Sequence, residues 1–114
     1  MTVDYRRAAL RKHYIAGFQV LSGALDQLLE RPEPYFDPEI LPDPHLPDDF
    51  CTRHRALRDG VVRDLSDIVK LPALARNFEV TRGAGLPIQG CLMRRDMELM
   101  RSDVKECLAA LRSL

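Results

Sequence analysis

The stretch MRRDMELMRSDVKECLAALRSL, residues 93–114, decides the fold class of this chain. Its apolar side chains recur at alternating steps of four and three residues, at Met93, Met97, Met100, Val104, Cys107, Leu111 and Leu114. This heptad spacing is typical of a helix that buries one stripe of side chains against another helix. We therefore predict a helix over about residues 88–113, preceded by the glycine-containing loop TRGAGLP.

Two further segments have the same helical periodicity. Residues 4–30 place one apolar stripe on a common face, and Pro32 and Pro34 end this first helix. Residues 48–70 place a second stripe on one inner face, which runs from Phe50 through His54 to Ile68. A short helix over 72–78 is a further candidate, because Pro72 suits the first helical position. The expected fold class is all-α, a bundle of three long helices in a single domain spanning residues 1–114.

A proline-rich arm separates the first two predicted helices. Residues 31–47 contain six of the eight prolines, which exclude a regular helix or a central strand. Apolar residues between the prolines, including Tyr35, Phe36 and Ile40, are too many for a free linker. We expect this arm to pack over the surface of the bundle.

Composition and charge exclude several classes of function. The chain has 17 basic and 17 acidic residues, so no net charge attracts it to nucleic acid. The basic group Arg53, Arg55 and Arg58 lacks interleaved aromatic residues and follows an acidic arm, so we expect no direct nucleic-acid contact. No apolar stretch approaches the roughly 18 residues of a membrane span. The three cysteines form no C-x-x-C pair and no signal peptide is apparent, which predicts reduced thiols and a cytoplasmic protein.

Few residues are arranged for chemistry. Cys51 and His54 lie three residues apart, the spacing of one ligand pair, and His45, Cys91 or Cys107 would have to complete a site. Structural zinc sites usually have two such pairs, so we predict no metal and no other cofactor. No nucleophile signature or phosphate loop is present, and we predict that the protein is not an enzyme.

The long apolar stripes predict an interaction protein. Six side chains are candidates for a dimer interface or a partner contact: Leu21, Leu25, Met93, Met97, Met100 and Val104. Gly17 and Gly23 lie within the predicted first helix, where the missing side chain would let a neighbouring helix come close. We expect a homodimer and a protein partner.

In size, in its three amphipathic stretches and in its lack of catalytic motifs, the chain resembles the small bacterial antiactivators of LuxR-type quorum-sensing regulators. The resemblance covers the whole chain and rests on architecture, so no functional residue is carried over from it. It implies a helical dimer that binds a transcription factor, blocks the factor's own dimer surface and so prevents DNA binding. Two alternatives are a histidine-phosphotransfer module that uses His54 in HRALRDG, and a secretion-chaperone-like adaptor.

Overall fold

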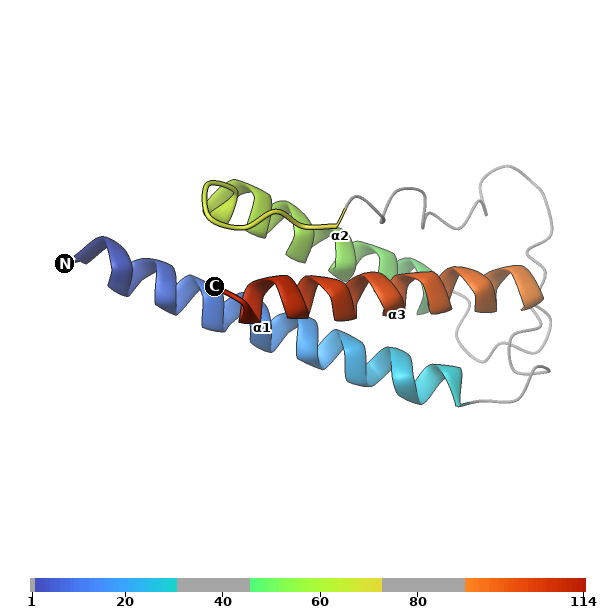
Figure 1. Cartoon of the computed structure of the whole chain (residues 1–114). Helices are drawn as coiled ribbons and strands as arrows, with labels where there is room; N and C mark the ends of the chain where they lie inside the picture. The colour runs from blue at the N-terminus through green and yellow to red at the C-terminus, as the bar shows by residue number, and fades with distance from the viewer. Residues whose placement is uncertain (1, 31–45, 73–89) are drawn as a thin grey trace.

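The described residues of this computed structural model, 2–30, 46–72 and 90–114, form three helices and contain no strand. The helices are α1 (Thr2–Leu29), α2 (Leu46–Leu65) and α3 (Gly90–Arg112). α2 and α3 both run antiparallel to α1 and therefore parallel to each other (Figure 1). The predicted all-α bundle of three long helices is confirmed. The proline-rich arm at 31–45 and the candidate helix beyond Pro72 lie outside the described residues.

The helix bounds agree best with the sequence for α1 and α3. α2 begins at Leu46, two residues before the predicted start, because Pro47 is tolerated in a first helical turn. It also ends at Leu65, five residues before the predicted end at 70. The N–H groups of Ile68 and Val69 both donate to the Leu65 carbonyl oxygen, at 3.0 Å each, which closes the helix. Ile68, predicted on the inner face, lies in the turn after α2 and is 37% exposed.

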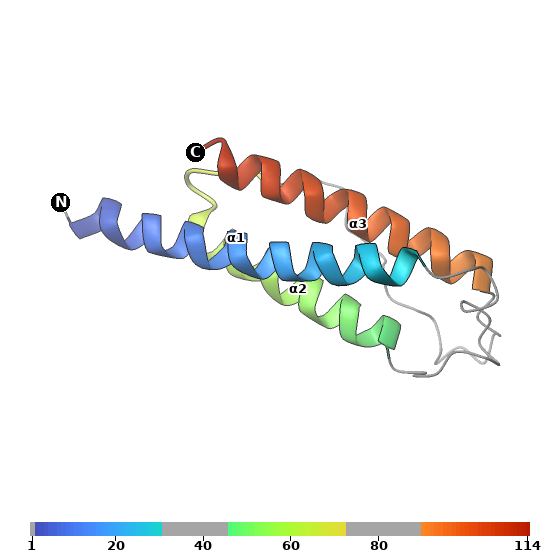
Figure 2. The ribbon, with the colours of Figure 1, turned by 90° about the horizontal axis from the view of Figure 1, so that it is seen from below.

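α1 organises the core, because it packs along both other helices, whereas α2 and α3 make few contacts with each other (Figure 2). The heptad stripe of α3 packs against α1 and is buried from Met97 to Leu111, whereas Leu114, beyond the end of the helix, is 42% exposed. One apolar cluster unites the three helices, and its fully buried members include Phe18, Leu21 and Leu25 from α1, Val61 and Leu65 from α2, and Met97, Met100, Val104, Cys107 and Leu111 from α3.

Two glycines allow α1 and α2 to approach closely. A Cβ atom built at Gly17 would lie 2.6 Å from Leu57 Cδ2, and one built at Gly60 would lie 2.7 Å from Tyr14 Cε1. The two glycines are on different helices, so each helix provides a gap for a side chain of the other. Gly17 therefore serves packing within the chain. Gly23 differs, because a Cβ built there would have no neighbouring atom within 4 Å.

The molecule is elongated, with principal extents of 55 × 27 × 19 Å. The first turns of α1 extend beyond the other helices (Figures 1 and 2), and Tyr5 is 84% exposed there. Arg7 pairs with Asp67 in the turn after α2, which ties this extension to the bundle. None of the helices in the described part of the chain combines the length and apolar character needed to cross a membrane.

Candidate functional site

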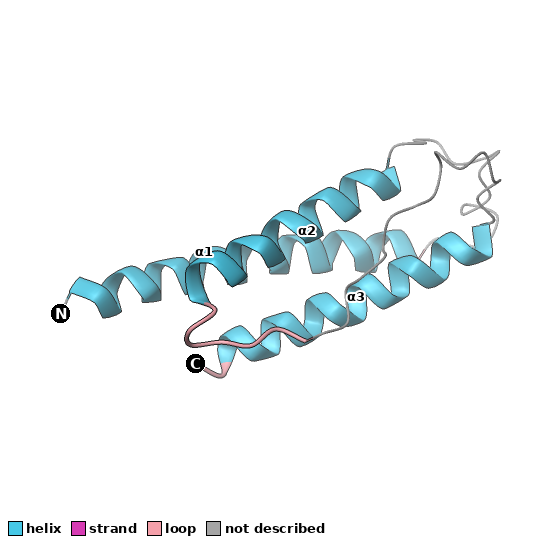
Figure 3. Ribbon diagram, turned by 90° about the horizontal axis from the view of Figure 1, so that it is seen from above, coloured by secondary structure: helices cyan, strands magenta, loops and turns pink. Residues whose placement is uncertain are grey.

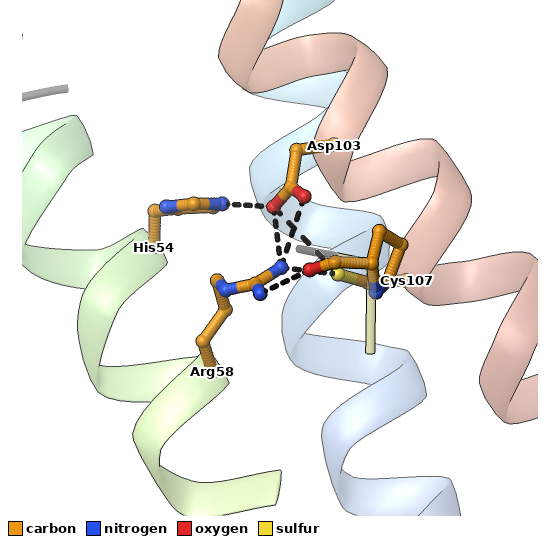
Figure 4. Close-up of polar contacts among 5 residues, drawn as sticks. His54, Arg58, Asp103 and Cys107 are labelled. Atoms are coloured by element: carbon orange, nitrogen blue, oxygen red, sulfur yellow. Dashed lines mark hydrogen bonds and ion pairs between the residues drawn. The ribbon is translucent and has the colours of Figure 1, made fainter. Parts of the chain in front are cut away.

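A buried polar cluster lies where α2 faces α3 (Figure 4). His54 and Arg58, one helical turn apart on α2, point toward Asp103 and Cys107, one turn apart on α3. The Asp103 side chain is 0% exposed and His54 is 3% exposed. This cluster supplies polar contacts between two helices that otherwise touch little.

The carboxylate of Asp103 is the centre of the cluster. It accepts a hydrogen bond from His54 Nε2 at 2.6 Å, and Arg58 Nη1 donates to both of its oxygens at 2.9 and 2.8 Å. A carboxylate has no proton to donate, so the ring nitrogen of His54 is the donor in this contact. Because the Arg58 guanidinium carries one positive charge, the buried carboxylate is already balanced, as a charge in an apolar interior must be.

Cys107 completes the cluster as a protonated thiol. Its Sγ atom donates to Asp103 Oδ2 at 3.7 Å and accepts from Arg58 Nη1 at 3.2 Å. Burial raises the pKa of the Cys107 thiol to about 12, and the neighbouring carboxylate adds to this shift. A nucleophilic cysteine needs the opposite, a lowered pKa, which a neighbouring cation can supply. Here Arg58 lowers the pKa of the thiol, but burial and the Asp103 carboxylate raise it by more, so the arrangement does not activate the thiol.

The chemistry available to this cluster is therefore structural. Arg58 Nη2 donates to the carbonyl oxygen of Pro72 at 2.5 Å, so the same guanidinium also holds the segment that follows α2. That segment turns back toward α3 after the end of α2 (Figure 3). Sequence reasoning placed His54 on the inner face, as the structure does, but missed Asp103 as its partner. In the sequence, only the position of Asp103 next to the apolar stripe distinguishes it from the surface acids.

Five of the six predicted interface residues are in the core of a single chain. Leu21 is 1% exposed, and Leu25, Met97, Met100 and Val104 are each 0% exposed. The side chain of Met93 lies outside the described residues. The apolar stripes of α1 and α3 thus cover each other, and a partner would have to contact other side chains. The homodimer itself stays a prediction.

Of the residues considered as metal ligands, His54 and Cys107 come together in the buried polar cluster, where each contacts Asp103. His54 is bonded to Asp103, while Cys51 is buried one turn before it on α2. Within the described ranges, no group of three His, Cys, Asp or Glu side chains is placed to hold a metal ion. His45 lies outside these ranges, as does the side chain of Cys91.

A second feature lies on the surface, on the outer face of α1. From Tyr14 to Leu25 α1 carries no charged side chain for twelve consecutive residues, and its exposed positions there are Ala16, Gln19, Val20 and Gly23. Val20 is 67% exposed. A groove of about 430 Å³ between α1 and α3 adjoins this face, with Gln19 and Gly23 on one side and Lys105, Leu108 and Arg112 on the other.

The chain matches no protein-family model, and comparisons with curated proteins and with solved structures found no similar protein.

Proposed function

We propose that this protein is a non-enzymatic cytoplasmic regulator that binds and inhibits a protein partner through the outer face of α1. In the form that the antiactivator resemblance suggests, the partner is a LuxR-type transcription factor. The observation that carries the proposal is the uncharged exposed face formed by Ala16, Gln19, Val20 and Gly23. A helix that is apolar on every side is expected to be covered on all sides, and Gln19 is the one polar side chain among these four exposed positions.

The other two helices make this face unusual within the same molecule. Charged side chains occupy five of the eight exposed positions described in α2, and five of eight in α3. None of the four exposed positions between Tyr14 and Leu25 is charged. Gly23 adds a cost of about 1 kcal/mol relative to Ala in a helix interior, although nothing in the bundle needs the space beside it. A partner that approaches closely would use that space.

The buried cluster favours a non-enzymatic function over the phosphotransfer alternative. A phosphotransfer histidine has to meet a donor protein at the surface, whereas His54 is 3% exposed and its Nε2 atom is bonded to Asp103. The thiol of Cys107 is kept protonated, as described above. A chaperone-like adaptor would also use an uncharged helix face, so the identity of the bound protein separates it from an antiactivator.

The test is affinity capture from the native cell with three baits: wild type, Val20→Glu and Val62→Glu. Val62 is a matched control, because it is an exposed valine on α2, 56% exposed compared with 67% for Val20. We expect wild type and Val62→Glu to retain the same protein and Val20→Glu to lose it. If that protein is a transcription factor, wild type but not Val20→Glu should abolish its DNA binding in a mobility-shift assay. Equal capture by all three baits would refute the proposed surface.

A further inference from the structure

We propose that, in the absence of another partner, the outer face of α1 is covered by α1 of a second copy, with the two helices antiparallel and Lys12 of each chain against Glu30 of the other. This inference rests on the surface of the proposed function and identifies its resting occupant. The dimer contact then lies on exposed residues of α1, and not on the buried stripe of α3 that contains Met97 and Met100.

Two unpaired charges bound the uncharged face. Lys12 precedes it and Glu30 follows it, both are exposed, and neither has an ion pair among the described residues. Glu30 continues the helical turn, because its N–H donates to the Asp26 carbonyl oxygen at 3.2 Å. Eighteen residues separate the two charges, which is five full turns and about 27 Å along the axis. They therefore lie on the same side of α1, one before and one after the uncharged stretch.

The opposite signs of these charges determine the orientation of the second copy. A two-fold axis beside position 21 places Lys12 of one chain against Glu30 of the other, twice in each dimer. A parallel pair would instead place Lys12 against Lys12 and Glu30 against Glu30, which is unfavourable. Charge complementarity thus favours the antiparallel pair over the parallel one.

The residues between the charges have the spacing of a helix–helix seam. Lys12, Ala16, Gln19, Gly23, Asp26 and Glu30 follow one another at steps of four, three, four, three and four. The same two-fold axis sets Gln19 against Gly23 of the other chain, where the missing Cβ leaves room for the longer side chain. Asp26 stays at the edge of the seam, because it already pairs with Lys105 at 3.4 Å and Arg101 at 3.7 Å.

One helix face is a small interface, so the dimer is weak. Interfaces well below about 1,200 Å² are typical of transient association. A weak dimer suits the proposed function, because a regulator has to release its own copy before it covers its target. Wild type is therefore expected to be a monomer at low micromolar concentration and a dimer toward millimolar concentration.

Zero-length carbodiimide cross-linking followed by peptide mass spectrometry tests the pairing. Lys12 and Glu30 of one chain are too far apart to be joined, so a cross-link between them has to connect two molecules. We expect that cross-link in the dimer band at high protein concentration. Dimers joined only through other residues would overturn the antiparallel pairing, and a wild type that stays monomeric at 1 mM would overturn the inference altogether.

Charge exchange provides a second test by sedimentation equilibrium. Lys12→Glu and Glu30→Lys should each weaken the dimer about tenfold, because each places two like-charge contacts in the seam. An equimolar mixture of the two variants should recover wild-type association, since the mixed dimer restores both opposite-charge pairs. No recovery in the mixture would contradict the antiparallel contact. If wild type is monomeric but Val20→Glu still loses the captured partner, this inference fails and the proposed function stands.

Discussion

Asp103→Asn is the substitution that tests the buried cluster most sharply. Asparagine keeps the size of the side chain but removes the charge that balances Arg58. Its amide group turns two donors toward neighbours that are themselves donors, so at least one hydrogen bond from Arg58 or His54 is lost. Arg58 is then a charge without a partner in a site where only 18% of its side chain reaches solvent.

The magnitude of this loss follows from the burial of the partners. Breaking a buried ion pair by removing one member costs about 3–5 kcal/mol, and a lost neutral hydrogen bond costs about 1 kcal/mol. Partial hydration of Arg58 brings the expected total to about 3–4 kcal/mol. A chain of this length has a free energy of unfolding of about 6–17 kcal/mol, so most of the variant should remain folded.

Urea unfolding followed by circular dichroism measures this effect. With a slope of about 1.5 kcal/mol/M, the midpoint should fall by about 2 M. Asp26→Asn is the matched control, because its carboxylate is 44% exposed and its ion pairs should contribute less than about 1 kcal/mol. An Asp103→Asn midpoint as close to wild type as that of the control would show that the buried cluster does not form as described.

The other predictions concern packing and pH. Gly60→Ala should lower the free energy of unfolding by about 1–3 kcal/mol, because the new Cβ would meet the ring of Tyr14. Gly23→Ala, measured at low micromolar concentration, should instead raise the free energy of unfolding by about 0.5–1 kcal/mol. The opposite order of the two variants in urea unfolding would refute this description of the packing. Met100→Lys should unfold the protein instead of yielding a folded monomer, because Met100 is 0% exposed and a buried charge costs several kcal/mol; a helical variant of unchanged midpoint would contradict this. Burial raises the pKa of the Cys107 thiol to about 12 from 9.0, so the contribution of the thiol to stability is fully present below pH 9 and is lost as the pH rises toward 12. Between about pH 8 and pH 10.5 the free energy of unfolding of wild type should therefore fall relative to that of Cys107→Ala. A difference between the two proteins that stays constant with pH would contradict the raised pKa.

The sequence predicted the helices because each has a long stripe of apolar residues at helical spacing. It did not predict what covers each stripe, since the spacing of Met97, Met100 and Val104 suits a second chain as well as α1 of the same chain. The structure resolves this choice in favour of α1. The end of α2 was missed because Ile68 continues the helical spacing even though the backbone has already turned.

Polar partners and glycines were harder to predict for a related reason. Asp103 is paired with residues about fifty positions earlier in the chain, and no local pattern encodes a contact at that separation. Gly17 and Gly23 looked alike in the sequence, yet one accommodates Leu57 and the other faces open space. The candidate surface on α1 required both kinds of information: the uncharged run from the sequence and the exposed fraction of Val20 from the structure.

The most direct test of the account measures whether the outer face of α1 is covered. Solvent paramagnetic relaxation of the Val20 methyl groups can be followed by NMR as the protein concentration rises from micromolar to millimolar, with the Val62 methyl groups as the internal reference. We expect the Val20 methyl signals to shift and to become protected from the paramagnetic agent, while the Val62 methyl signals stay exposed to it. Equal exposure of the two valines over the whole range, and again after addition of the captured partner, would contradict it.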